Sequence, residues 1–444
     1  MRPPEPPPSF TGAWLTRRVL GWALFDIASS TYIALVPTFF GLYFTTVVAG
    51  GQPSANAWWG VTAAASLLLA GILAPIVGAH ADHSGRWLRA VVVATALCAL
   101  AAMLLPLGAA NGVLVAAAVF VVAQVGYTLA TSIYDSLVVD VAAPGHRGRI
   151  SALGWSLGML GGVVAIGGAL LTIRGVPPTA QVGHLDSLFV LGGVLFAVLA
   201  APGLAGLRGL RAPIELPAGH AAGLAASVRA VGTTLRRWRA HLPALQVLVS
   251  FFLINDVLVT IQFFVVIVLS SQFGLAVDGL LRLALLYHLV AIPSTVAFGT
   301  LADRWGARPT VLAMCVALSG VILLLAFGRA DWVPVAAVVQ LGLVFASIQA
   351  VFRSLYASLV PPAQAAELFG FNAVAGRLSA ALGPLIFGVA AAAFGSNTWA
   401  LCLLFLPLSA GAWLLAAVDL TGRGATGGAT PEAAGLSGHG RDGR

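Results

Sequence analysis

Lysine is missing from this chain of 444 residues, and all 23 of its basic residues are arginine. Charged residues of either sign make up only 9% of the sequence, whereas soluble chains carry roughly a quarter. Without lysine, the chain cannot contain the G-x-x-x-x-G-K-[ST] loop that holds nucleotide phosphates. The low charge excludes an ordinary soluble protein, and the missing loop argues against ATP-driven transport by this chain.

Cysteine is also scarce. The three cysteines, Cys98, Cys315 and Cys402, each lie in an apolar segment and show neither a disulfide framework nor metal-ligand spacing. We interpret them as small apolar residues. We therefore expect no metal site and no resident cofactor.

Long apolar segments dominate what is present, since 59% of the residues are hydrophobic. Segments such as 57–79 and 310–327 have the length of about 20 residues that a helix needs to cross a bilayer. Glycine, proline and charge clusters divide the chain into about twelve such spans. The predicted spans are 19–49, 57–80, 89–109, 112–142, 151–173, 186–207, 243–271, 279–301, 309–328, 332–360, 370–394 and 397–418.

These spans predict two six-helix bundles, at 19–207 and 243–418. The polar segment 208–242 between them is predicted to be a cytoplasmic linker, and 1–18 and 419–444 are predicted to be disordered. The first apolar stretch is long enough to remain in the membrane, so we do not interpret it as a cleaved signal.

The arginines predict the orientation. With a cytoplasmic N-terminus, 18 arginines fall in inside segments and 3 in outside segments, which is the bias of the positive-inside rule. We expect both termini on the cytoplasmic side of the cell (inner) membrane. The arginines are scattered among short loops, so the formal charge of +8 does not predict a nucleic-acid partner. The expected partners are lipid and a small-molecule substrate, and we expect a monomer.

A loop motif repeats in the two halves. Gly78, Asp82 and Gly85 after the second span match Gly299, Asp303 and Gly306 after the eighth. This G-x-x-x-D-x-x-G loop, followed by arginine, resembles the signature loop of the major facilitator superfamily. Segments 21–32, 253–256, 348–354 and 367–372 resemble its vacuolar amino-acid effluxer branch, which includes autophagy-related effluxers and bacterial relatives.

The resemblance extends along both halves. It implies an all-α membrane protein with the major facilitator fold, in which about twelve transmembrane helices form two pseudo-symmetric six-helix bundles. Spans 1, 4, 7 and 10 would line a central path. Two related halves are also the architecture of an alternating-access carrier.

Charged side chains inside the spans are the informative ones. An ionised group at the bilayer centre costs roughly 2.5–3.5 kcal/mol, so it must face a wet interior or a partner. Polar residues also recur at helical spacing in the fourth and tenth spans. The predicted substrate or coupling cavity contains Asp26, Ser30, Tyr32, Tyr127, Thr131, Asp135, Asn255, Asp256, Gln262, His288, Gln349, Arg353 and Arg377.

Their chemistry suggests a ligand of both charges. Arg353 and Arg377 can hold a carboxylate through paired hydrogen bonds, while Asp26 and Asp256 can bind an ammonium group or take up a proton. An alternative is that the charges form structural ion pairs, for instance Asp135 with Arg353. His288 could relay protons, or could be a neutral side chain bonded to a carbonyl.

The repeated loops have two readings. They could be a gating latch, in which aspartates cap helices and arginines pair with acids, or rigid turns. The residues concerned are Gly78, Asp82, Gly85, Arg86, Gly299, Asp303, Arg304, Gly306 and Arg308.

The sequence therefore predicts a secondary active transporter for a small solute, with no catalytic residues. The preferred solute is an amino acid or another zwitterionic or anionic metabolite, moved outward by alternating access, and proton coupling is left open. Alternatives are a membrane receptor or scaffold without transport, and an exporter of unrelated small molecules or drugs. An intramembrane enzyme is disfavoured because the spans contain no nucleophile–base motif.

Overall fold

Helices make up almost all of the described chain. The computed structural model describes residues 16–84, 86–137, 141, 147–208, 242–359 and 380–418. In these ranges the backbone forms helices joined by short turns and contains no β-strand. The predicted segments 1–18, 208–242 and 419–444 fall largely outside them.

The helices follow the predicted spans closely. In the first half they are α1 (Arg17–Tyr43), the π-helical turn η1 (Phe44–Val48), α2 (Ala55–Ser84), α3 (Trp87–Ala110), α4 (Val113–Ser136), α6 (Arg147–Thr172) and α7 (Leu185–Gly206). In the second half they are α9 (Leu242–Phe273), α10 (Val277–Trp305), α11 (Ala307–Phe327), α12 (Val333–Leu359), α14 (Leu382–Phe394), α15 (Asn397–Leu403) and α16 (Phe405–Ala417).

Ten of the described helical segments are long and apolar enough to cross a membrane. Leu157–Thr172 and Leu382–Phe394 are shorter apolar helices, and the second is the described part of the predicted span 370–394. The predicted all-α membrane fold is confirmed.

Proline explains two local departures from regular helix. The last predicted span is divided at Leu404 because Pro407 has no N–H to donate to the carbonyl of Leu403. Inside α1, Pro37 likewise leaves the carbonyl of Ile33 without its helical donor. The hydroxyl of Thr38 donates to that carbonyl at 2.9 Å, so the carbonyl stays hydrogen-bonded within an apolar surrounding.

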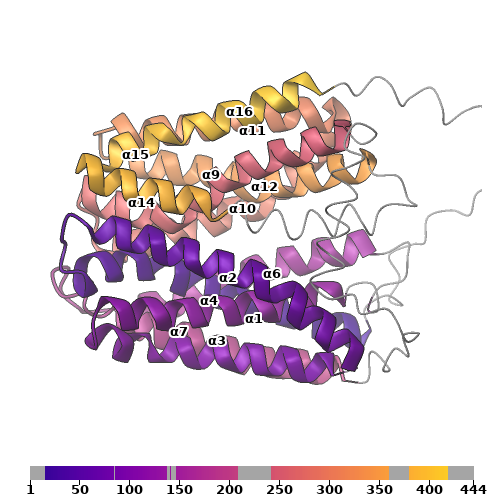
Figure 1. Cartoon of the computed structure of the whole chain (residues 1–444), viewed down its shortest axis with the longest axis horizontal. Coiled ribbons are helices and arrows are strands. Elements are labelled where there is room, and N and C mark those ends of the chain that lie inside the picture. Colours follow the sequence, from indigo (N-terminus) through magenta and orange to yellow (C-terminus); the bar gives the residue numbers. More distant parts are fainter. Residues whose placement is uncertain are drawn as a thin grey trace, which may run out of the picture.

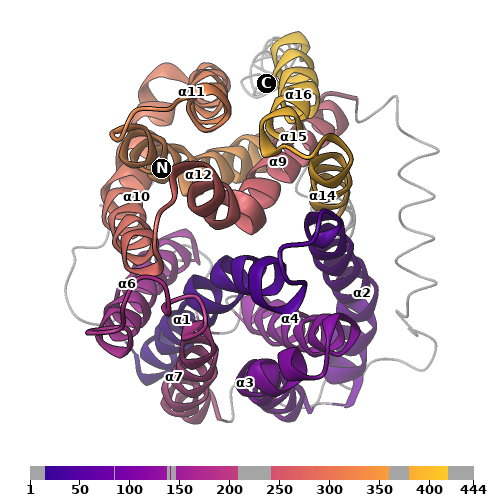
Figure 2. The ribbon, with the colours of Figure 1, turned by 90° about the vertical axis from the view of Figure 1, so that its left-hand side faces the viewer.

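The two halves lie side by side. Figure 1 shows α1–α7 below and α9–α16 above, and Figure 2 shows both bundles from one end. Between the halves, α1 packs on α9, α2 on α14 and α6 on α10. Three helices from each bundle therefore form the contact between the halves.

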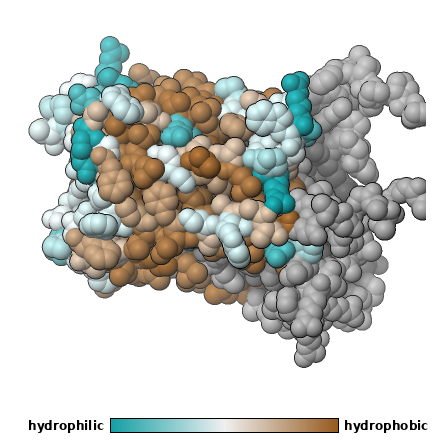
Figure 3. Space-filling model, turned by 90° about the horizontal axis from the view of Figure 1, so that it is seen from above, coloured by the Kyte–Doolittle hydropathy of each residue, from teal (hydrophilic) through white to brown (hydrophobic). Residues whose placement is uncertain are grey.

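The outer surface is apolar between two more polar ends. Figure 3 shows this hydrophobic band on one face of the molecule. Large side chains are freely exposed, such as Leu171 (69%), Val316 (73%) and Leu406 (69%). Contiguous exposure of this kind is uncommon on soluble monomers and is expected of a lipid-facing surface.

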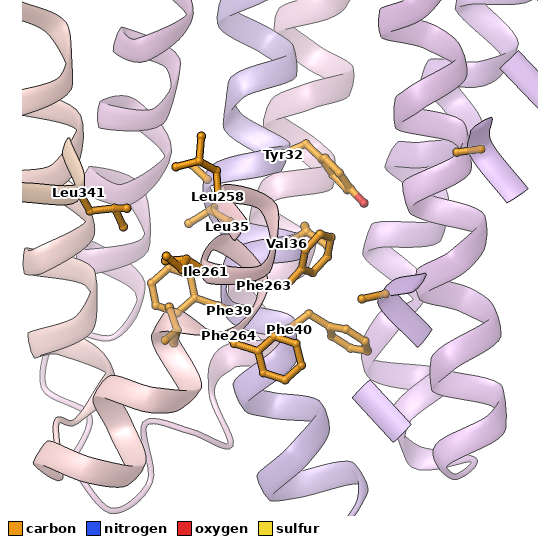
Figure 4. Packing of buried hydrophobic residues seen from close by; sticks show 14 of the residues in the cluster. Tyr32, Leu35, Val36, Phe39, Phe40, Leu258, Ile261, Phe263, Phe264 and Leu341 are labelled. Carbon is orange, nitrogen blue, oxygen red and sulfur yellow. The ribbon is translucent and has the colours of Figure 1, made fainter. Parts of the chain in front are cut away.

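Aromatic residues pack together on one stretch of the contact between α1 and α9. Figure 4 shows Phe39 and Phe40 of α1 close to Phe263 and Phe264 of α9. Trp59 of α2 is fully buried, and its Nε1 donates to the carbonyl of Phe263 at 3.0 Å. This bond joins the two halves inside the apolar core.

Further contacts between the halves gather at one end of the molecule, which we call the joined end. There, Asn56 Nδ2 donates to Asn397 Oδ1 at 3.3 Å, and the amide of Asp278 donates to Gln181 Oε1 at 3.0 Å. The turns 49–54, 174–184, 274–276 and 395–396 lie at this end.

Two glycines allow α2 and α14 to touch near the joined end. A methyl group placed on Gly60 would lie 2.5 Å from the carbonyl oxygen of Pro384 and 3.0 Å from the Cα of Gly388. No side chain separates the two backbones, which is the close small-residue packing common between membrane helices.

Replacing Gly60 with alanine should therefore destabilise the protein. Alanine favours a helix by about 1 kcal/mol over glycine, but overpacking against backbone atoms costs about 1–3 kcal/mol. We expect Gly60→Ala to lower the melting temperature of the purified protein. The matched control is Gly167→Ala, where a methyl group meets no atom within 4 Å, and its melting temperature should not fall. Equal melting of the two variants would show that the crossing tolerates a side chain.

Candidate functional site

A cavity of about 1020 Å³ lies between the halves. Its walls come from α1, α4 and α6 of the first half and from α9, α10 and α12 of the second. The predicted lining helices α1, α4, α9 and α12 are all present, and α6 and α10 add to them. The lining residues are Trp22, Asp26, Ser29, Ser30, Ile33, Ala34, Thr38, Tyr127, Thr131, Asp135, Gly158, Met159, Gln262, Val265, Val266, Leu269, Leu280, Leu283, Ala284, Tyr287, His288, Val338, Leu341, Phe345 and Gln349.

The first-half wall is polar and acidic. Asp26 of α1 and Asp135 of α4 both face the cavity and interact electrostatically. The rings of Trp22 and Tyr127 belong to the same wall. Two carboxylates on one wall repel when both are ionised, so this side of the cavity favours a positive partner or a proton between them.

The aromatic residues beside Asp26 are held rigidly. Trp22 stacks on Tyr134 with ring centroids 4.9 Å apart. The Tyr134 hydroxyl donates to the carbonyl of Trp22 at 2.6 Å, and Trp22 Nε1 donates to the carbonyl of Tyr134 at 3.4 Å. This reciprocal pair links α1 to α4, so both carboxylate-bearing helices are fixed relative to one another.

Helix α6 approaches Asp26 closely because it carries glycine there. A methyl group on Gly154 would collide with the carboxylate of Asp26 and with the Trp22 ring. One turn later, a methyl group on Gly158 would lie 2.9 Å from the hydroxyl of Ser30. The glycines of α6 therefore leave room for the polar side chains of α1.

The second-half wall is mainly aliphatic. Its lining includes Val265, Leu269 and Leu283, with Val338 and Leu341 from α12. Polar groups on this side come from Gln262, Tyr287, His288 and Gln349. The cavity thus presents acidic groups on one side and an apolar surface on the other.

His288 has a defined hydrogen-bonding state. Its Nδ1 lies 2.8 Å from the carbonyl oxygen of Ala284, so Nδ1 carries the hydrogen and Nε2 accepts when the ring is neutral. The ring fills the space beside Gly162 of α6, where a methyl group would collide with Nε2. His288 therefore joins α10 to α6 at the cavity wall, and its ring is bonded to a carbonyl as the second alternative expected.

The structure brings together eight of the predicted cavity residues. These are Asp26, Ser30, Tyr127, Thr131, Asp135, Gln262, His288 and Gln349. Trp22, Ser29, Thr38 and Tyr287 also line the cavity, and of these the prediction missed Trp22 and Thr38 entirely. Trp22 lies one turn before Asp26 on α1, and this helical spacing could have identified it.

Three predicted residues lie elsewhere. Tyr32 is buried behind the wall, where its hydroxyl donates to Gln124 Oε1 at 3.2 Å and its ring stacks on Tyr127. Asn255 is half-buried on α9 and does not line the cavity. Asp256 is also outside the lining and accepts from the amide of Gly383 at 2.8 Å. Their placement corrects the expectation of one shared cavity, because each is turned away by the rotation of its helix.

The two predicted arginines are not described in full. Arg353 is part of α12, one turn after Gln349, but the structure does not describe its side chain. Arg377 lies in 360–379, wholly outside the described residues. The predicted pair of Arg353 with Asp135 therefore stays a prediction.

The repeated loops are described in part. Gly85 and the side chain of Asp82 lie outside the description, while Gly78 and Gly299 have open space beside them and Arg86, Asp303 and Arg304 are exposed. Gly306 ends α10 with φ +95°, a conformation that favours glycine. Arg308 Nη1 donates to the carbonyl of Val418 at 2.9 Å, which ties this loop to the end of α16. A gating role stays a prediction.

Comparison with known proteins decides the family. The model of the family described as "Vacuole effluxer Atg22 like" matches residues 45–426. This chain belongs to the Atg22-like family. The uncharacterized MFS-type transporter YxiO of Bacillus subtilis (strain 168) is 26% identical over 425 residues, covering 91% of this chain and 95% of YxiO. Autophagy-related protein 22 of Cryptococcus neoformans is 26% identical over 287 residues, covering 59% of this chain and 50% of that protein.

Solved transporters share the fold of this Atg22-like protein. The crystal structure of a D-xylose-proton symporter superposes with a TM-score of 0.67 at 15% sequence identity, covering 90% of this chain and 97% of the symporter. The predicted major facilitator fold is confirmed, and the family supports secondary transport. No group of three or more potential metal ligands occurs in the described part of the chain.

The His288 contact predicts a non-additive pair of substitutions. Gly162→Ala should destabilise the protein by about 1–3 kcal/mol, because the new methyl group overpacks against the imidazole. In a His288→Ala background the same change should cost much less, since the colliding ring is gone. A double-mutant cycle measured by thermal or denaturant unfolding tests this coupling. Additive effects would place His288 away from α6.

Proposed function

We propose that this Atg22-like protein is a secondary active transporter that binds a small solute between its halves and exposes it alternately to the two sides of the membrane. The cavity of about 1020 Å³ is at the upper end of the size range of small-molecule sites, about 300–1,000 Å³. Its position between two six-helix units is where carriers of repeated architecture bind solute.

The acidic first-half wall carries the proposal for the solute class. Asp26 and Asp135 can bind an ammonium group, and the Trp22 and Tyr127 rings can add cation–π attraction. Arg353 follows Gln349 by one turn of α12, and an arginine there would suit a carboxylate. We therefore propose an amino acid, or another zwitterionic or anionic metabolite, as the solute.

The aliphatic second-half wall favours a second candidate. Val265, Leu269, Leu283 and Leu341 would accept an apolar body of almost any outline. An exporter of unrelated amphipathic molecules or drugs would use the same wall without a carboxylate partner. A receptor or scaffold that has lost transport is less well supported, because it would be expected to have a filled cavity, whereas the space between the halves is about 1020 Å³.

Direction and location rest on separate support. The family description names an effluxer, and we propose efflux across the cell (inner) membrane. The arginine bias supports cytoplasmic termini. In that orientation the joined end faces the outside, and the transporter works without a resident cofactor, as a monomer.

Transport by proteoliposomes tests the solute class. We expect uptake of one or more members of an amino-acid panel and a 10- to 100-fold weaker apparent affinity in Asp26→Asn, because a hydrogen bond to a charged group is worth about 1.5–3 kcal/mol. Asp278→Asn is the matched control, since the half-buried Asp278 pairs with the exposed Arg282 and is not among the cavity-lining residues. Solutes with an amine but no carboxylate separate the two candidates.

A specific result would contradict the carrier proposal. If no solute in the panel moves, and Arg353→Ala changes no ligand binding measured by thermal shift, the cavity is not a transport site. If only amphipathic compounds without a carboxylate move, the second candidate replaces the first.

Thiol labelling tests the orientation. Gln52 lies in an exposed turn at the joined end, and Arg86 is exposed at the opposite end of α2. With the native cysteines replaced by alanine, Gln52→Cys should react with a membrane-impermeant maleimide in intact cells. Arg86→Cys should react only after the membrane is permeabilised. The reverse pattern would invert the proposed orientation.

A further inference from the structure

Asp256 is an intramembrane carboxylate that does not line the cavity. It is 8% exposed on α9, and its Oδ1 accepts from the amide of Gly383 at 2.8 Å. Gly383 is the second residue of α14, whose N-cap position is Ala381, a residue with no side-chain acceptor. Asp256 therefore caps α14 from a neighbouring helix and supplies the acceptor that the side chain of Ala381 lacks.

Gly383 makes this cap sterically feasible. A methyl group at this position would collide with the hydroxyl of Thr260 and lie 2.7 and 2.8 Å from the carboxylate oxygens of Asp256. Thr260 donates to the carbonyl of Asp256 at 2.7 Å, so its hydroxyl has its own partner. The start of α14 is thus held against α9 by a contact that only glycine permits.

The helix α14 also crosses α2 of the other half at close range, a contact that we call the α2–α14 crossing. Within two turns of Gly383, Gly388 packs on Gly60 of α2, and the carbonyl of Pro384 lies beside Gly60 as well. One short helix is therefore held by Asp256 in its own half and by α2 of the other half. A change at the cap reaches the crossing through a single rigid segment.

Few other charges act on Asp256. Six described helices pack on α9, and α14 and α16 among them contain no titratable side chain. The others contribute Asp26 and Tyr32 from α1, Tyr287 and His288 from α10, Arg308 and Cys315 from α11, and Tyr356 from α12. The side chain of Arg353 lies outside the description. In the described residues, the positive N-terminal end of α14 is the group that responds to the charge of Asp256.

We propose that Asp256 is a proton-binding site separate from the solute cavity, and that its protonation loosens α14 at the crossing with α2. Ionised Asp256 attracts the amide and the positive end of α14. A proton taken up from solution onto the carboxylate removes the charge, leaves a weak neutral acceptor and frees the start of α14 to move. By linkage, proton binding and separation of α2 from α14 favour one another.

Only the functional effect of this proton site, the coupling of solute movement to a proton gradient, rests on the proposed transport function. The solute would bind at the acidic wall of the cavity, while the proton would bind at Asp256. This division follows from the exposure of Asp26 and Asp135 to the cavity and the absence of Asp256 from its lining.

Spin-label distances test, without any solute, whether protonation of Asp256 loosens α14 at its contact with α2. Labels at Asn56→Cys and Asn397→Cys, with the native cysteines replaced by alanine, report on the joined end. We expect a longer distance to gain population roughly tenfold between pH 8 and pH 5, in the range of ordinary coupling factors. Asp256→Asn, which keeps an acceptor oxygen but no charge, should show the longer distance at both pH values.

Control variants make the result decisive. Asp331→Asn changes an exposed carboxylate and should keep the pH response. Gly383→Ala should give the longer distance at both pH values by steric means, and it replaces Asp256→Asn if that variant fails to fold. If either variant retains the wild-type pH response, Asp256 is only a structural cap and the proposal is overturned.

Proteoliposomes separate this failure from failure of the transport function. Asp256→Asn should retain solute exchange without a gradient and lose stimulation by a pH gradient. Exchange with unchanged stimulation overturns the proton site alone. Absence of exchange in the wild type overturns the proposed transport, while the distance measurement still tests the effect of Asp256 protonation on α14.

Discussion

The cost of placing charge in hydrocarbon shapes this protein more than any other constraint. Asp26, Asp135 and Asp256 all lie in helices that are otherwise apolar enough to cross a membrane. The structure accommodates them in two ways. Asp26 and Asp135 line the cavity between the halves, and Asp256 accepts a hydrogen bond from a backbone amide of the neighbouring helix α14. Each solution needs helices from different parts of the chain.

Glycine makes both solutions geometrically feasible. Gly154 of α6 leaves room for Asp26, and Gly383 of α14 leaves room for Asp256. In each case the polar group of one helix reaches the backbone surface of another, which a larger side chain would prevent. Glycine costs helix propensity, so its use here reflects close approach between helices and not local conformational preference.

The cavity is asymmetric although the two halves repeat a loop motif. Both described carboxylates of its lining belong to the first half, while α9, α10 and α12 contribute mostly aliphatic surface. Such a division can orient a solute, with its charged end toward α1 and α4 and its apolar part toward the second half. His288 and Gly162 bring the two walls together at the edge of this space.

The sequence alone determined the apolar helices that the structure describes and the family, because hydropathy, span length and loop motifs are properties of consecutive residues. It also identified eight of the lining residues, since helical spacing places Tyr127, Thr131 and Asp135 on one face of α4. Only the tertiary structure decided that Asp256 and Tyr32 leave the cavity while Trp22 and Thr38 join it. Which side chains of a span face the cavity depends on the rotation of the helix about its own axis. Packing against helices that are distant in the sequence sets that rotation.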